Sequence, residues 1–366
     1  MTLGIGIIGA TGYIGTPYRA EIRECNDVRI VALCARRQEL LSQAAEEDQA
    51  ELATAKWQEV VEHPDVDLVM VLTPDALHEE PVLAAASAGK AIFCEKPIGK
   101  NISEASSMNR AVETAGVASY VPFWTRYVPV FEKAREFIQD GKLGEVQGIM
   151  YRWHNPRPPA MPFTWRDDAE LSAAGSIADV GSHAYDTLRY LLGEEATRVL
   201  TDARTLMPAK PDLGDINLDE AISWGSENAS PQGGKTRRGS VPDYAQIAVE
   251  FPSGIIGSIV LSHASYLRKG FAPELEIHGT DASLSVNRIT GELLIADSPD
   301  PARHLETIED TGHCNRFKSH VFPAFEKPAP KHPTVRDGWL VQIFTDAAVA
   351  SAERGAWVET NEFASQ

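Results

Sequence analysis

The first third of the chain alternates short apolar runs with amphipathic segments. A short apolar run between turn residues is typical of a buried strand, and apolar residues at helical spacing indicate a helix. We expect strands at Leu3–Gly9, Val28–Cys34, Val66–Leu72, Ala91–Cys94 and Val117–Val121, and helices at Tyr13–Glu24, Gln38–Glu46, Ala76–Ala88 and Ser103–Thr114. Ser103 is the expected N-cap of the last helix, and Gly89 and Gly116 are expected helix stops. Alternating strands and helices favour an α/β fold with a parallel, doubly wound sheet.

The pattern changes after Pro122. We expect helices at Val130–Gln139, Val180–Leu192 and Val335–Ala350, and strands at Val146–Trp153, Tyr244–Phe251, Ile255–His263, Glu274–His278 and Ser283–Val286. Two of these strands, Tyr244–Phe251 and Ile255–His263, alternate apolar or small residues with polar ones, so one face of their sheet is expected to be exposed or covered by a partner. Lys210–Pro242 is polar and rich in Gly, Ser and Pro, and we interpret it as a surface excursion. The second half is therefore expected to be an α+β domain with a largely antiparallel open sheet.

Length and charge restrict the class of protein. A chain of 366 residues suggests two domains, which we place at residues 1–122 and 123–366. The formal net charge of −18 argues against binding to nucleic acid or to an anionic membrane, because phosphate groups attract clustered Lys and Arg. No apolar run approaches the roughly 20 residues of a membrane span, and no basic leader is evident, so we expect a cytoplasmic protein. The four cysteines lack metal-binding spacing; we expect buried thiols and no metal site.

A glycine-rich turn joins the first strand to the first helix. Gly9, Gly12 and Gly15 are spaced GxxGxxG rather than GxGxxG. Such a turn lets the backbone approach a pyrophosphate, and the N–H groups at the start of the helix then bind its charge. The predicted cofactor contacts in this turn are Gly9, Thr11, Gly12, Tyr13 and Ile14.

Arg36 and Arg37 follow the second strand, at the place where an NAD-binding protein usually carries an acidic residue for the ribose diol. Guanidinium groups bind a 2′-phosphate through paired hydrogen bonds. We therefore favour NADP(H) and keep NAD(H) as the alternative. The two arginines could also simply begin a solvated helix.

Polar residues follow the strands that end near residues 72 and 94. In open α/β sheets, ligands bind beyond the carboxyl ends of the strands. The predicted cofactor contacts at these two ends are Thr73, Pro74, His78, Glu95 and Lys96. A lysine beside a bound nicotinamide is partly desolvated and can hydrogen-bond a substrate hydroxyl.

Asp179 and His183 are four residues apart within the expected helix Val180–Leu192 and its N-terminal flank. On one helix they would share a face, with Asp186 one turn further on. Gly181 costs helix stability, about 1 kcal/mol relative to alanine, which suggests a close neighbour such as cofactor or substrate. The pair is a candidate for acid/base chemistry.

Together these motifs resemble the Gfo/Idh/MocA family of NAD(P)-dependent oxidoreductases. The resemblance includes the glycine turn, Thr73-Pro74 with His78, Glu95-Lys96-Pro97, Arg126-Tyr127-Val128-Pro129, Gly141–Glu145, Trp165-Arg166, and Asp179–His183 with Asp186. It covers most of the chain and weakens across Pro208–Pro242. The glycine spacing and Gly175-Ser176, where the family often has a glycine run, depart from the family pattern.

The resemblance implies that Lys96, Asp179 and His183 form the catalytic group in a cleft between the two domains. His183 would take the proton of a carbinol that loses hydride, Lys96 would hydrogen-bond the same oxygen, and Asp179 would orient the substrate or tune the other two. The expected substrate is a secondary alcohol or ketone of a sugar, sugar derivative or cyclitol. The predicted substrate contacts are Arg126, Tyr151, His154, Trp165, Arg166, Asp179 and His183.

Two other functions are compatible with the same motifs. One is a glycosidase that uses tightly bound NAD for transient oxidation, and the other is a regulator that senses a dinucleotide without catalysis. Because the expected second sheet lacks a helix after each strand, one face could be covered by another copy, so we expect a homodimer or homotetramer.

Overall fold

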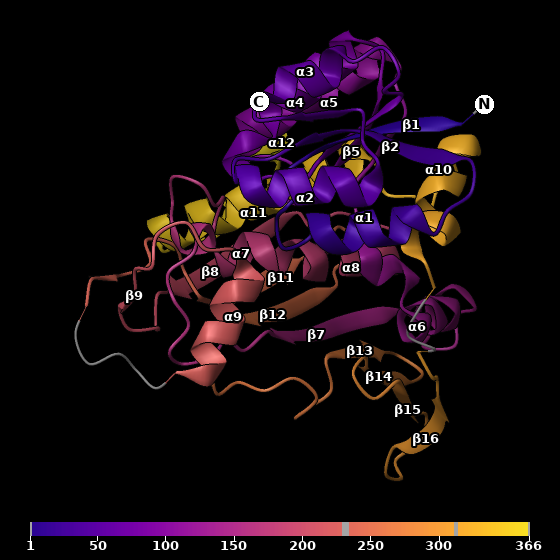
Figure 1. Ribbon diagram of the computed structural model, residues 1–366. Helices are drawn as coiled ribbons and strands as arrows, with labels where there is room; N and C mark the ends of the chain where they lie inside the picture. Colours follow the sequence, from indigo (N-terminus) through magenta and orange to yellow (C-terminus); the bar gives the residue numbers. More distant parts are fainter. Residues whose placement is uncertain (1, 229–233, 311–313, 365–366) are drawn as a thin grey trace. The chain divides into compact units, whose positions relative to one another are not determined.

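Apolar runs near the N-terminus form a six-stranded parallel sheet in the order β3-β2-β1-β4-β5-β6, the crossover order of a Rossmann fold. Figure 1 labels β1, β2 and β5 of this sheet. The strands are β1 (Leu3–Ile8), β2 (Val28–Cys34), β3 (Leu52–Thr54), β4 (Leu68–Val71), β5 (Ala91–Cys94) and β6 (Ser119–Tyr120). The helices are α1 (Gly15–Arg23), α2 (Gln38–Asp48), α3 (Trp57–Glu62), α4 (Glu79–Ser87) and α5 (Ile102–Ala115). The expected strands and helices are present, and β3 and α3 are additional.

The computed structural model describes residues 2–228, 234–310 and 314–364 and divides into two units. Unit 1 comprises Met1–Pro122, Asn217–Asp219 and Gly312–Trp339, and unit 2 comprises Phe123–Ile216, Glu220–Thr311 and Leu340–Gln366. The first boundary falls where the sequence pattern changes. Unit 1 also recruits a late segment, which the expected ranges 1–122 and 123–366 did not separate from unit 2.

The late segment completes the core of unit 1. Phe317 is fully buried, and its ring lies 5.1 Å from that of Tyr18 and 5.7 Å from that of Phe93, centroid to centroid. Tyr18 belongs to α1 and Phe93 to β5, so the aromatic cluster joins a helix, a strand and a segment more than two hundred residues away. Aromatic pairs in this geometry add about 0.5–1.5 kcal/mol beyond the area they bury.

The N-cap of α5 is Asn101, not Ser103 as expected. The side-chain oxygen of Asn101 accepts a hydrogen bond of 3.1 Å from the backbone N–H of Glu104. An asparagine in extended conformation immediately before the helix satisfies the first free N–H groups, which leaves Ser103 inside the helix. The cysteines also differ in part from expectation: Cys34 and Cys94 are buried, whereas Cys25 is half-buried and Cys314 is exposed.

Unit 2 contains a nine-stranded sheet in the order β16-β15-β14-β13-β7-β12-β11-β8-β17. Its strands are β7 (Val146–His154), β8 (Arg198–Arg204), β11 (Tyr244–Glu250), β12 (Ile256–Ser262), β13 (Leu275–Gly279), β14 (Ser283–Asn287), β15 (Glu292–Ala296), β16 (Arg303–Thr307) and β17 (Val358–Glu359). Every neighbouring pair is antiparallel except β7 and β12, which run parallel. The α+β fold with a largely antiparallel sheet is therefore confirmed.

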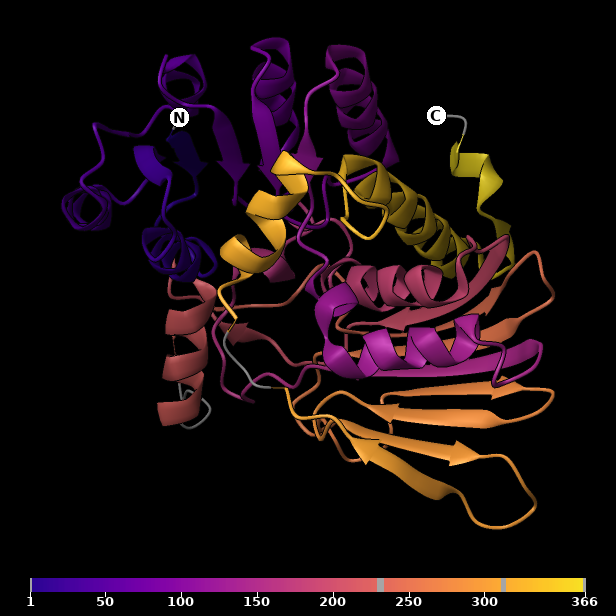
Figure 2. The same ribbon diagram turned by 90° about the vertical axis from the view of Figure 1, so that its right-hand side faces the viewer.

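The unit 2 sheet carries helices on one face, as Figure 2 shows for the helices above β7. The helices of this unit include α6 (Pro129–Gln139), α7 (Ser176–Asp179), α8 (Gly181–Leu192), α11 (Val335–Arg354, which begins in unit 1) and α12 (Asn361–Ala364), whereas α10 (Phe322–Glu326) belongs to unit 1. Alternate residues of β7, namely Ile149, Tyr151 and Trp153, are buried toward these helices. Met150 on the opposite face is 39% exposed.

The expected helix Val180–Leu192 and its flank form two helices that meet at Val180. Asp179 is the last residue of α7, and His183 lies in the first turn of α8. The two residues therefore do not lie on one continuous helix as the i, i+4 argument assumed. Gly181 begins α8, and a Cβ there would lie 2.7 Å from Cδ1 of Leu261 on β12. The close neighbour that explains this glycine is thus the sheet beneath the helix.

The expected excursion Lys210–Pro242 contains β9 (Lys210–Pro211), α9 (Leu218–Glu227) and β10 (Thr236–Arg237), with β9 and β10 paired in a small antiparallel ladder. Residues 229–233 of the excursion lie outside the described part of the chain. In the described part, no helix combines the length and the apolar character that crossing a membrane requires.

Candidate active site

The glycine turn of unit 1 has a conformation that only small residues permit. Gly9 has φ +91°, and a Cβ there would lie 2.6 Å from the carbonyl oxygen of Leu72. A Cβ at Gly15 would lie 2.5 Å from the carbonyl oxygen of Gly9. The N–H of Gly12 donates to Gly9 O over 3.1 Å and closes the turn. A side chain at Gly9 or Gly15 would push the first helix away from the strand ends.

Three backbone N–H groups of this turn, those of Thr11, Tyr13 and Ile14, make no hydrogen bond with any residue in the described part of the chain. They lie directly before α1, where the helix dipole favours negative charge. This arrangement fits the pyrophosphate of a dinucleotide. The turn follows β1, and β4 is its neighbour in the sheet, so it lies at the topological switch point.

His78 connects the ends of β4 and β5. Its ring is completely buried, with Nδ1 3.0 Å from the carbonyl oxygen of Pro97 and Nε2 2.8 Å from that of Thr73. Burial lowers the pKa of His78, against the raising effect of these carbonyls. In unit 1, the His78 ring therefore lies between the loop after Thr73 and the turn after Lys96, and the ring nitrogen that carries the proton donates to one of the two carbonyls.

Glu95 and Lys96 lie at the carboxyl end of β5. The Glu95 carboxylate accepts hydrogen bonds from the Tyr18 hydroxyl at 2.8 Å and from the Lys96 backbone N–H at 3.1 Å. Desolvation raises the pKa of Glu95, and the positive charge of Lys96 opposes that rise. Glu95 is thus held against α1.

Arg36 and Arg37 follow β2, the strand that pairs with β1. Arg37 is the residue before α2, and Arg36 is exposed. Both therefore lie at the same edge of the sheet as the glycine turn, where an adenosine ribose binds in Rossmann folds.

Unit 2 holds Asp179 between two basic side chains. Oδ2 of Asp179 is 3.2 Å from a guanidinium nitrogen of Arg157 and 3.2 Å from Nε2 of His263. Burial lowers the pKa of His263, although its contact with Asp179 raises it. Arg157 also donates its backbone N–H to His263 O, which fixes the spacing of the two partners. A carboxylate supported in this way is oriented by the protein before any ligand arrives.

His183 packs among aromatic rings. The imidazole stacks on Trp153 with centroids 5.4 Å apart and planes 15° apart, and it meets the edge of Phe123 at 6.2 Å. The Arg288 guanidinium lies over the Trp153 ring, 4.1 Å from its centroid. Trp153 comes from β7 and His183 from α8, so the sheet determines where the imidazole lies.

Arg126 and Asp186 form a buried ion pair. Two nitrogens of Arg126 donate to the two carboxylate oxygens of Asp186 at 2.8 and 2.6 Å, and both side chains are at least 97% buried. Arg189 adds a contact of 3.3 Å to the same carboxylate. Asp186 therefore lies in the interior, and Arg126, a predicted substrate contact, has its guanidinium committed to a protein carboxylate.

The other predicted substrate contacts lie in different places within unit 2. Tyr151 is fully buried and packs on Phe131 and Trp153. His154 ends β7 and lines a cavity formed with the segment after β12. Trp165 and Arg166 lie in a capped 3₁₀ turn, where the Arg166 guanidinium covers the Trp165 ring at 4.2 Å.

Sequence reasoning gave no role to His263 or Lys269, and it placed Arg157 in a segment, residues 154–157, that either shapes the substrate pocket or is a plain loop. Each follows the carboxyl end of one of the two parallel strands, β7 and β12. Polar residues at that end of paired parallel strands are a usable signal. It could not be applied because the expected sheet was antiparallel there. In the described ranges 2–228, 234–310 and 314–364, no three His, Cys, Asp or Glu residues form a metal-binding group.

A glycine turn at a Rossmann switch point and a carboxylate–imidazole site in an α+β unit define a dinucleotide-dependent oxidoreductase. Residues 3–123 match the oxidoreductase family with an NAD-binding Rossmann fold, and residues 131–285 match the GFO/IDH/MocA C-terminal domain. The chain belongs to the Gfo/Idh/MocA family and is an enzyme of the oxidoreductase class.

Named relatives act on sugars and cyclitols. Levoglucosan dehydrogenase of Pseudarthrobacter phenanthrenivorans is 28% identical over 88% of this chain and 87% of its own length. Inositol 2-dehydrogenase of Rhizobium meliloti is 26% identical over 96% of this chain and 97% of its own length. The structure of levoglucosan dehydrogenase in complex with NADH has 25% identity and a TM-score of 0.82, covering 98% of this chain and 99% of that one.

Proposed function

We propose that the protein is an NADP(H)-dependent oxidoreductase that transfers a hydride between nicotinamide and a secondary alcohol or ketone of a sugar, sugar derivative or cyclitol. The observation that carries the proposal is the pre-oriented Asp179 carboxylate, held by Arg157 and His263 within the unit that also presents His183. The substrates in the names of the relatives, levoglucosan and inositol, support the substrate class.

The residues of the proposed mechanism are Lys96, in unit 1, and Asp179 and His183, in unit 2. The bound dinucleotide supplies the hydride acceptor. As the carbinol C–H bond breaks, Nε2 or Nδ1 of His183 takes the hydroxyl proton and becomes imidazolium. Lys96 donates a hydrogen bond to the same oxygen and stabilises the developing alkoxide. Asp179 accepts a hydrogen bond from a neighbouring hydroxyl of the substrate, and this bond positions the carbinol. In the reverse direction His183 returns the proton to the carbonyl oxygen.

The function is tested by following nicotinamide absorbance with a panel of polyols, aldoses and cyclitols, each offered with NADP⁺ and NAD⁺. We expect oxidation of at least one polyhydroxylated compound. If a dinucleotide purifies with the protein, and the protein cleaves a glycosidic bond without net redox change, the protein is the glycosidase instead. Dinucleotide binding without turnover of any member of the panel, or of the matching ketones, would favour a sensor.

Arg36 is expected to determine the choice of cofactor. Replacing Arg36 by alanine should weaken NADPH binding about tenfold or more and change NADH binding little, because only NADPH has a 2′-phosphate for the guanidinium. Fluorescence titration of the two reduced cofactors measures both dissociation constants. Arg29→Ala, at the other end of β2, is the matched control. Equal losses for both cofactors, or a wild-type preference for NADH, would contradict this assignment.

We also propose a homodimer or homotetramer in which the open face of the unit 2 sheet is covered by another copy. This face exposes apolar side chains, with Ile256 61% and Met150 39% exposed. Ile256→Glu should shift the protein toward monomer in light scattering, because a buried unpaired carboxylate opposes association. Leu206→Glu, at a residue 55% exposed after β8, is the control. A wild-type monomer at micromolar concentration would refute the proposal.

A further inference from the structure

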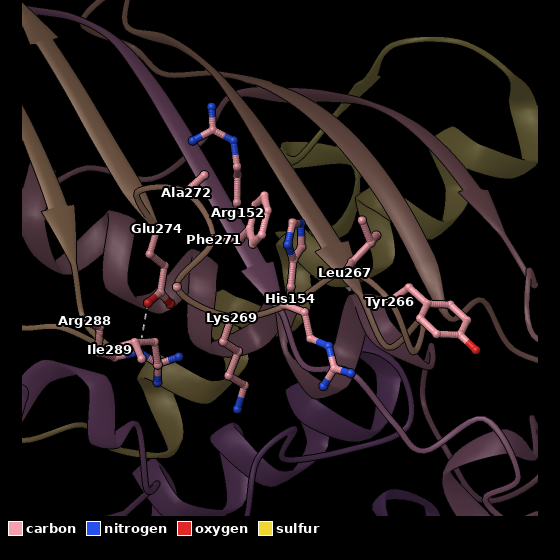
Figure 3. Close-up of a pocket in the computed structure, with 12 residues that line it drawn as sticks. Arg152, His154, Tyr266, Leu267, Lys269, Phe271, Ala272, Glu274, Arg288 and Ile289 are labelled. Atoms are coloured by element: carbon pink, nitrogen blue, oxygen red, sulfur yellow. Dashed lines mark hydrogen bonds and ion pairs between the residues drawn. The ribbon is translucent and has the colours of Figure 1, made fainter.

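A cavity of about 290 Å³ lies within unit 2, at the end of β7 (Figure 3). Its walls come from β7, from the segment between β12 and β13, and from the residues that follow β14. The volume is close to the lower end of the range for small-molecule sites, about 300–1,000 Å³. The mechanism above uses none of the residues that line this cavity.

The lining is rich in positive charge, although the chain as a whole has a net charge of −18. Arg152, Arg268, Lys269 and Arg288 contribute cations, and Glu274 is the one acidic residue among the lining residues described. Arg152 is turned away from Lys269 and pairs with Glu276 at 3.1 Å (Figure 3). Arg288 donates to Glu274 at 3.1 Å.

Besides Arg268, Lys269 is the lining cation that takes part in neither of these two pairs. Its side chain points into the same space as Glu274 and Arg288 (Figure 3). It makes no hydrogen bond or ion pair with a residue of the described ranges. Desolvation lowers the pKa of Lys269, and the positive charges of Arg288 and Arg157 lower it further, while Glu274 and Asp179 oppose this. Those two carboxylates already accept hydrogen bonds from Arg288 and Arg157, and Lys269 is exposed, so its ammonium is open to an anionic ligand.

Glu274 supplies the complementary acceptor. The residue is 93% buried, and its Oε1 has no hydrogen-bond partner in the described part of the chain, while Oε2 accepts from Arg288. A buried carboxylate oxygen without a partner is costly unless a donor reaches it. A ligand hydroxyl is such a donor. The cavity thus offers an ammonium for an anion and a carboxylate oxygen for a hydroxyl.

The cavity adjoins the catalytic residues of unit 2. Arg288, which lines it, lies over the Trp153 ring, and Trp153 stacks on His183. The segment that carries Lys269 begins at His263, the partner of Asp179. One stretch of chain therefore builds both the support of Asp179 and the wall of the cavity.

We infer that this cavity binds the anionic group of the substrate, so that the enzyme acts on an acidic sugar, carrying a carboxylate or a phosphate, in preference to a neutral one. This inference rests on the proposed function, since it names the substrate class of the same site. Lys269 binds the anion, and Glu274 accepts a hydrogen bond from a hydroxyl of the same molecule.

Isothermal titration calorimetry with D-glucuronate, D-glucose 6-phosphate and D-glucose tests the inference without requiring turnover. We expect at least one of the two anions to bind about tenfold or more tightly than glucose, because charged hydrogen bonds are the strong ones. Which anion binds more tightly distinguishes carboxylate from phosphate. Lys269→Met should remove the preference, and Lys269→Arg should retain most of it. Lys142→Met, at an exposed lysine before β7, should leave it unchanged.

The outcomes separate this inference from the proposed function. Anion binding that Lys269→Met abolishes supports the cavity even if no compound is oxidised. Rapid oxidation of neutral sugars, with the same kcat/KM in Lys269→Met as in the wild type, would contradict anion binding in the cavity. The proposed oxidoreductase function would then still hold. Equal binding of glucose and both anions by the wild type would overturn it as well. A melting curve for Lys269→Met separates lost binding from lost folding.

Discussion

Replacing His183 by asparagine should lower kcat by about 10²–10⁴-fold, the usual contribution of a positioned general acid or base. Asparagine approximates the size of the imidazole and can hydrogen-bond the substrate, but it cannot take a proton at neutral pH. The KM for the substrate should change much less than kcat. Steady-state kinetics with the best compound of the panel measure both quantities.

The control for this variant is His278→Asn, at an exposed histidine of β13, which should retain full activity. Because His183 also packs on Trp153, tryptophan fluorescence shows whether the variant keeps its local structure. A His183→Asn enzyme with correct folding and kcat within about threefold of the wild type would assign the proton transfer to another group, and Lys96 would be the first candidate.

Replacing Asp186 by asparagine should destabilise the protein by about 3–5 kcal/mol, because it leaves the buried Arg126 guanidinium without its counter-charge. Arg126 is 97% buried and donates to both oxygens of Asp186, so an amide cannot replace the carboxylate. Denaturant unfolding, with the slope of each transition compared, measures the loss.

The double variant Arg126→Met with Asp186→Leu provides the matched test, since an apolar pair of similar size avoids the buried charge. It should recover most of the stability lost by Asp186→Asn.

The same double variant also tests the predicted role of Arg126 in substrate binding. If Arg126 binds substrate, the KM of the refolded double variant rises although its stability is restored. An unchanged KM would restrict Arg126 to a structural role.

The parts of the fold that sequence reasoning predicted depend on neighbours in the chain. The turn between β1 and α1 is recognisable because Gly9 needs a positive φ and because an apolar run precedes it. The β5 end at Glu95 is recognisable for the same local reason, an apolar run that stops abruptly. Such features are encoded within about ten residues and need no knowledge of the tertiary structure.

The parts that sequence reasoning missed depend on residues far apart in the chain. His263 reaches Asp179 only because β12 lies parallel to β7 under α7 and α8. The local sequences of β7 and β12 do not predict this pairing. The close approach of Gly181 to Leu261 is again a contact between distant segments. The charged groups that act on Lys269, such as Arg157 and Asp179, also come from distant segments.

The position of Phe317 has a consequence for the order in which the protein can fold during synthesis. Its buried ring completes the cluster of Tyr18 and Phe93. The core of unit 1 therefore lacks this third ring until nearly the whole chain has been made. At about 5–20 residues per second, a ribosome needs on the order of ten seconds or more to travel from Pro122 to Phe317. During that time the nascent N-terminal unit carries an open apolar hollow beside α1.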